Sequence, residues 1–163
     1  MSQAPGRTHQ YYRGKPVVPF GHGLSFSVFK IEHQGPPKIT MSTGASTAVN
    51  VTLAVTNAGQ RIGDCVVLAF LRPQSMPKQP GSRLIQKLIG FERIADLKPM
   101  AIARVAFTLS ADTLALADLS TGDLVQTPGS FELAFADGAG NEIVVPLEII
   151  GEQYVVEEFP RAS

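Results

Sequence analysis

Tryptophan is absent from this sequence, and cysteine occurs once in 163 residues. A single cysteine cannot form a disulfide bond within the chain, so a small fold held together by disulfides is excluded. Cys65 precedes the apolar residues Val66, Val67 and Leu68. This setting predicts a small buried side chain in preference to a reactive thiol.

Charge is also scarce, at 17% of residues, and 14 basic residues balance 14 acidic ones, so the formal net charge is zero. Without a basic excess, we expect no binding to nucleic acid phosphates. The longest apolar run, residues 66–71, is too short to cross a membrane, and residues 1–10 lack the apolar stretch of a secretory signal. We therefore expect either an intracellular protein or a piece cut from a longer chain, and we favour the second.

The apolar residues that are present, 44% of the chain, alternate with polar ones in short segments. Residues 47–56 show the clearest period of two, which predicts a half-buried strand, and residues 64–72 are nearly all apolar, as in a central strand. Residues 111–118 are the only helix-like segment, with Ser110 as its N-cap. The predicted strands are residues 24–32, 47–56, 64–72, 84–94, 101–109, 130–136 and 142–150.

Seven short alternating strands separated by turn residues are typical of an immunoglobulin-like sandwich. The Cys…Trp…Cys core of antibody domains is absent, so a fibronectin type III-like variant fits better. We predict an all-β, seven-stranded sandwich over residues 24–150. An extended arm, residues 1–23, precedes it, and a tail without a strand partner, residues 151–163, follows it. The predicted core comprises Val51, Leu53, Val67, Phe107, Leu109, Phe131, Leu133 and Val145.

Four motifs occur in order along the chain. Arg-Thr-His-Gln-Tyr-Tyr at residues 7–12 leads to Pro-Phe-Gly-His-Gly-Leu-Ser-Phe at residues 19–26. Val-Thr-Asn-Ala-Gly follows at 55–59, then Leu-Ile-Gly-Phe-Glu-Arg-Ile at 88–94 and Pro-Gly-Ser-Phe at 128–131. Together they resemble the domain junction and the C-terminal fibronectin type III-like domain of glycoside hydrolase family 3, which includes β-glucosidases and β-xylosidases.

The sequence departs from the family pattern at a few positions. His9 and His22 stand where tyrosine is usual, and we interpret them as packing or hydrogen-bonding substitutes. Phe26 also replaces a tyrosine. Met100 stands where the family has glycine after Lys-Pro, so the turn around it must either differ in shape or place a non-glycine residue at positive φ.

The resemblance implies that the arm lies at a domain junction and that two later motifs are structural. The implied junction residues are Arg7, Tyr11, Tyr12, Pro19, Phe20, Gly21, Gly23, Leu24 and Phe26. The implied structural residues are Asn57, Gly59, Gly90, Phe91, Glu92 and Arg93. For Glu92 and Arg93 we favour an ion pair or a backbone-holding role over a contact with a neighbouring domain.

In the resembled family, the nucleophilic Asp and the acid/base Glu lie in segments that precede this one. A retaining glycosidase needs both carboxylates, so we expect this chain alone to be non-catalytic and to have no cofactor. The local acidic residues suggest solvated or turn-and-cap roles: Asp112, Asp118, Asp123, Glu157 and Glu158. The three histidines are not spaced as metal ligands.

The favoured function is an accessory domain that stabilises the catalytic domains of a family 3-like enzyme. The alternative is a stand-alone module that binds carbohydrate or protein through loops such as 73–83 or 118–129, and the absence of tryptophan counts against it. The arm could carry a sugar-stacking strip, although we favour an interdomain plug. The aromatic residues in question are Tyr11, Tyr12, Phe20, Phe26 and Phe29.

The expected partners are catalytic domains of the same enzyme, with polysaccharide or another copy of the chain as further candidates. Without the catalytic domains, the arm should fold back on the sandwich or pack against another copy. Asn50-Val51-Thr52 matches an N-glycosylation acceptor pattern on an outward strand face. A chance match is the favoured interpretation for Asn50.

Overall fold

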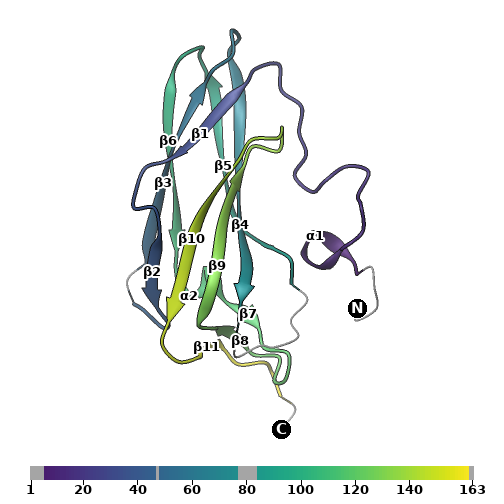
Figure 1. Cartoon of the computed structure of the whole chain (residues 1–163), viewed down its shortest axis with the longest axis vertical. Helices are drawn as coiled ribbons and strands as arrows, with labels where there is room; N and C mark the ends of the chain where they lie inside the picture. Colours follow the sequence, from purple (N-terminus) through teal and green to yellow (C-terminus); the bar gives the residue numbers. More distant parts are fainter. Residues whose placement is uncertain (1–5, 47, 77–83, 162–163) are drawn as a thin grey trace.

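The seven predicted strands and an eighth that the sequence analysis missed, the four-residue edge strand β2, form the two main sheets of a β-sandwich (Figure 1). The computed structural model describes residues 6–46, 48–76 and 84–161. The first sheet has the order β1-β3-β6, with bounds Phe29–His33, Val49–Asn57 and Ile102–Leu109. The second has the order β2-β10-β9-β4-β5, with bounds Ile39–Ser42, Glu142–Ile150, Gly129–Ala136, Gly63–Ser75 and Lys87–Leu97. Neighbours pair antiparallel except β2 and β10, which are parallel.

A small third sheet at one end of the sandwich corrects the prediction for the tail. Its strands are β7 (Leu116–Ala117), β8 (Leu124–Gln126) and β11 (Tyr154–Glu157). The tail was predicted to lack a strand partner, but β11 pairs antiparallel with β8 (Figure 1). These strands have two to four residues, too few for a period of two to stand out in the sequence.

The core lies between the two main sheets, where every second side chain points inward. All eight residues predicted for the core are buried, with at most 6% of their surface exposed. Cys65 is buried as well, and burial raises the pKa of its thiol to about 11. The thiol therefore serves as a small apolar group, as predicted from its neighbours.

Of residues 111–118, which were expected to be helical, only Ala111–Leu114 form a helical turn, α2, and Leu116–Ala117 belong to strand β7 instead. The side chain of Ser110 caps α2 by accepting a hydrogen bond from the Thr113 N–H, at 3.2 Å. The first strand was predicted to begin at residue 24, but it begins at Phe29, directly after exposed Val28, which is where the apolar parity of the sequence slips.

The turn before β6 has one of the two shapes that the sequence allowed. Met100 adopts φ of +61°, the left-handed conformation that glycine normally supplies. Its N–H donates to the Asn57 carbonyl at 2.8 Å, and this bond ties the turn to the end of β3. Met100 also exposes its side chain. Within the described residues, no helix is long and apolar enough to span a membrane.

Candidate functional site

The arm folds back on the outer face of the five-stranded sheet, beside β4 and β9 (Figure 1). It begins with the single helical turn α1 (Thr8–Tyr11). The Gln10 carbonyl accepts a hydrogen bond from the Ile85 N–H at 2.7 Å, and the Gly23 N–H donates to the Gly138 carbonyl at 3.1 Å. Of the two arrangements left open by the sequence, this chain adopts the fold-back.

Two glycines allow the arm to approach the sandwich closely. A Cβ atom on Gly21 would lie 2.3 Å from a Leu68 methyl group, and one on Gly138 would lie 2.0 Å from the Gly21 carbonyl oxygen. Both glycines also have positive φ, at +82° and +72°. Side chains at either position would therefore push the arm off the sheet.

Three rings hold the middle of the arm in place. His9 stacks on Phe20, with ring centroids 4.0 Å apart and planes 17° apart. Both rings meet Phe70 of β4 edge-on, at 6.4 and 6.1 Å. Burial lowers the pKa of His9, which keeps the imidazole neutral and suited to this apolar contact. The packing role inferred for His9 from the sequence agrees with this geometry.

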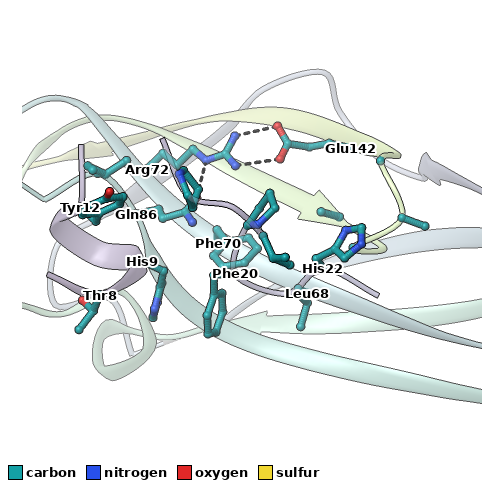
Figure 2. Close-up of a pocket in the computed structure, with 18 of the residues that line it drawn as sticks. Thr8, His9, Tyr12, Phe20, His22, Leu68, Phe70, Arg72, Gln86 and Glu142 are labelled. Atoms are coloured by element: carbon teal, nitrogen blue, oxygen red, sulfur yellow. Dashed lines mark hydrogen bonds and ion pairs between the residues drawn. The ribbon is translucent and has the colours of Figure 1, made fainter. Parts of the chain in front are cut away.

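A groove of about 920 Å³ lies between the arm and the sheet. Figure 2 shows a row of polar side chains along it: the Arg72 guanidinium donates two hydrogen bonds to the Glu142 carboxylate, at 2.7 and 2.8 Å, and one to Gln86 at 3.1 Å. Tyr12 lies at one end of the row and His22 towards the other.

Residues 24–28, which we name the linker, connect the arm to β1 with an inverted polarity. Leu24 and Phe26 are each 93% exposed, whereas Ser27 between Phe26 and Val28 is 9% exposed. The Ser27 hydroxyl donates a hydrogen bond of 2.6 Å to the Asn57 side chain. The linker thus turns a polar side chain inward and apolar ones outward, the reverse of a strand on a sandwich surface.

Asn57 fixes the linker and two turns at once. Its side-chain amide donates to the carbonyls of Arg61 and Leu97, both at 2.7 Å, and its side-chain oxygen also accepts from the Gly59 N–H at 2.9 Å. A Cβ atom on Gly59 would lie 2.1 Å from the Ser27 hydroxyl oxygen. Asn57 and Gly59 therefore connect the end of β3 with the linker and with the backbone at Arg61 and Leu97.

The motif at residues 88–94 combines packing within the sandwich and an ion pair at its surface. A Cβ atom on Gly90 would lie 3.3 Å from the Phe107 ring, and the pairing of β4 with β5 shifts register next to this point. Arg93 pairs with Asp64 at 2.5 Å, and this contact lowers the pKa of Asp64. Phe91 and Glu92, in contrast, are exposed.

Asp118 holds a turn, as expected, and Asp118 and Asp123 both hold the tail. Asp118 accepts hydrogen bonds from Ser120 and from the Gln153 side chain, and these lower its pKa. Asp123 accepts from the Phe159 N–H at 2.8 Å and pairs with Arg161 at 3.1 Å. Sequence reasoning missed these contacts because the partners are 35 to 38 residues apart.

The remaining predicted positions are scattered. Asn50 is exposed on β3, and its side-chain oxygen accepts a hydrogen bond from the Thr108 hydroxyl at 2.9 Å. Phe29, one of the five aromatic residues considered for a sugar-stacking strip, is buried in the core and cannot belong to a surface strip.

Loop 73–83, which was considered as a binding loop, lies mostly outside the described residues. Within those residues, no group of three or more His, Cys, Asp or Glu side chains could hold a metal ion.

Comparison with known proteins agrees with the sandwich and with the motifs. A model of the fibronectin type III-like domain matches residues 66–139. A probable exo-1,4-beta-xylosidase from Aspergillus japonicus is 31% identical over 98% of this chain. The structure of a GH3 exo-beta-xylosidase superposes with a TM-score of 0.78 at 26% identity, over 96% of this chain and 22% of that one. This chain is a fibronectin type III-like domain, and it is similar over nearly its whole length to a segment of glycoside hydrolase family 3 enzymes.

The match extends to the arm and the linker as well as the sandwich, since nearly the whole domain aligns with the relatives. A β-glucosidase from Erythrobacter marinus has the same fold, with a TM-score of 0.73 at 24% identity over 90% of this chain and 20% of that one. The domain spans about a fifth of the length of the curated relatives it matches, 21% of the Aspergillus japonicus xylosidase.

Proposed function

We propose that this domain is a non-catalytic accessory unit of a family 3-like glycoside hydrolase, and that it docks on the catalytic domains and stabilises them. The observation that carries the proposal is the inverted linker. Leu24 and Phe26 are each 93% exposed, more than any large apolar side chain on a strand of the two main sheets, of which Phe91 and Ile102 are the most exposed at 65% and 64%. Exposed adjoining apolar side chains mark a contact surface.

The size of the relatives supports a neighbouring domain as the partner of the linker. About four-fifths of the Aspergillus japonicus xylosidase lies outside the segment that this domain matches. Burying a large apolar side chain contributes about 1.5–3 kcal/mol. Leu24 and Phe26 together would then add a substantial share of the free energy of unfolding of a typical domain, about 5–15 kcal/mol.

The first test is activity. The isolated domain should not hydrolyse aryl β-xylosides or aryl β-glucosides, because the resemblance places both catalytic carboxylates in other segments. Turnover above a heat-inactivated control, retained after repurification, would contradict the proposal.

The second test is a chimera in which this domain replaces the matching fifth of the Aspergillus japonicus xylosidase. The double substitution Leu24→Ser and Phe26→Ser should lower the unfolding temperature and activity of the chimera. In the isolated domain the same change should leave stability within about 0.5 kcal/mol, because both side chains are already exposed there. Phe159→Ser, at a half-exposed position of the tail, is the matched control. Equal behaviour of the linker variant and the control in the chimera would count against docking through the linker.

A further inference from the structure

We propose that the groove between the arm and the five-stranded sheet binds a short neutral oligosaccharide. The groove is formed entirely by residues of this domain, so the inference goes beyond the accessory role and does not depend on it. Its volume of about 920 Å³ lies within the range of small-molecule sites, which are mostly apolar with a few well-placed polar groups.

The two kinds of surface in the groove match the two kinds of surface on a sugar ring. Tyr12 and Phe20 are 38% and 50% exposed, so ring surface remains available to the C–H face of a pyranose. Arg72, Gln86 and Glu142 form the polar row along the groove (Figure 2). Sugar hydroxyl groups both donate and accept hydrogen bonds, so they can use the guanidinium, amide and carboxylate groups alike.

The charge of the groove selects a neutral ligand. Arg72 and Glu142 form a bidentate pair and cancel each other's charge. Burial lowers the pKa of His9, which stacks on Phe20, so its imidazole is neutral at pH 7. A charged ligand would therefore gain no net attraction from these groups and would lose its own hydration.

The groups that would contact the ligand are already held in place. Arg72 is oriented by both Glu142 and Gln86. The Tyr12 ring packs so closely on Gly14 that a Cβ atom there would lie 2.4 Å from its hydroxyl oxygen. Binding would then order few additional side chains, which keeps the entropic cost low.

An extended peptide fits the groove less well than a sugar does. Peptides commonly bind by adding a strand to a free sheet edge. The strands under the groove are β4 and β9, and each is already paired on both sides, β4 with β9 and β5, and β9 with β10 and β4. Recognition in the groove must therefore rely on side chains.

The test is a titration of the isolated domain with xylotriose, with cellotriose and with the charged trisaccharide trigalacturonate, followed by calorimetry or by amide chemical shifts. We expect saturable binding of at least one neutral trisaccharide, with Kd below about 10 mM, and weaker binding of trigalacturonate. A comparison of xylotriose with cellotriose shows whether the groove prefers a chain of pentoses or a chain of hexoses.

Four substitutions locate the binding. Glu142→Gln removes one charge of the polar row at nearly constant shape, and Tyr12→Ala removes a ring; each should weaken binding about tenfold. Phe91→Ala removes an exposed aromatic ring of β5 outside the groove and should change nothing. Tyr12→Phe retains the ring and should bind like the unsubstituted domain. It is the control for Tyr12→Ala, in which the fold of the arm could also be lost.

Several results would overturn the inference. The first is that neither xylotriose nor cellotriose shows saturable binding at concentrations up to about 20 mM, roughly twice the highest Kd that we expect. The second is equal binding by Glu142→Gln and Phe91→Ala. The third is tighter binding of trigalacturonate than of the neutral sugars. Self-association of the domain that Tyr12→Ala abolishes would also overturn it, because the groove would then serve a protein contact.

Discussion

The two ends of the chain are attached to the same sandwich in different ways. The tail is held by polar contacts that are completed within the domain: Asp123 accepts from the Phe159 N–H and pairs with Arg161, and Asp118 accepts from Gln153. On the N-terminal side, the linker between the arm and β1 is held by its polar residue Ser27, which donates a hydrogen bond to Asn57. Its apolar side chains are left in solvent.

This difference indicates which end of the domain needs a partner. A segment whose contacts are complete within the chain can be stable alone, whereas an inverted segment gains stability only when another surface covers it. The arm lies between these cases, since His9 and Phe20 pack on Phe70 while Phe20 remains half exposed.

The largest effect on this comparison should come from the core that both ends share. Leu53→Ala or Phe131→Ala removes a large side chain from a fully or nearly fully buried position. Each should lower the free energy of unfolding by about 2–5 kcal/mol, measured by chemical denaturation. Full stability of both variants would show that the inward faces of β3 and β9 are assigned wrongly.

Loss of the Asn57 side chain should have the next largest effect and should act on the linker. Asn57→Ala removes the hydrogen bond to the Leu97 carbonyl and the one from the Ser27 hydroxyl, which keeps its contact with the Arg61 carbonyl at 3.0 Å. A buried group left unpaired costs about 1–3 kcal/mol, so we expect a loss of this size from the Leu97 carbonyl. Amide hydrogen exchange should speed up in residues 24–28 and 58–62 and remain unchanged in the tail. Equal acceleration in the tail would refute separate attachment of the two ends.

Removal of residues 1–19 tests how far the arm belongs to the sandwich. The sequence alone favoured a small loss of stability, on the view that the arm serves a neighbouring domain. The stacked His9, which this truncation removes, and the Gln10–Ile85 hydrogen bond now favour a measurable loss, about 1–3 kcal/mol. That corresponds to a fall in unfolding temperature of roughly 2–10 °C, measured by calorimetry. An unchanged midpoint would assign the arm to the neighbour instead.

Most of the sandwich could be predicted from the sequence because many strands alternate, as residues 49–57 do, and because the central strand is a nearly continuous apolar run at residues 64–72. The four-residue strand β2 is too short for such a signal and was missed. The positive φ at Met100 could also be anticipated, because a glycine expected there is missing. The groove could not be predicted. Arg72 and Glu142 are 70 residues apart, and the arm reaches them only through the close approach of Gly21 and Gly138. The local periodicity of a sequence carries no information about contacts between residues so far apart in the chain.

The smallest effect should come from the tail and should depend on pH. Hydrogen bonds from Phe159 and Thr121 and the charge of Arg161 lower the pKa of Asp123 below its ordinary value of 3.8. The tail is therefore held fully above that ordinary value, and its attachment weakens as the pH falls through the lowered pKa of the folded state. The protection of the Phe159 amide, which is its exchange rate relative to that of an unstructured amide at the same pH, should fall in this range, and Asp123→Asn should flatten the dependence. Protection that does not change with pH in the unsubstituted domain would argue against the Asp123 clamp.

The central claim is that the outward face of the linker is covered by another domain, and the chemical labelling of Phe26→Cys tests it most directly. The native Cys65 is buried, with a pKa raised to about 11, so it should contribute little background. We expect fast reaction with a maleimide in the isolated domain and at least about tenfold slower reaction in the xylosidase chimera, while Phe159→Cys reacts similarly in both. Equal labelling of Phe26→Cys in a folded, active chimera would contradict the account.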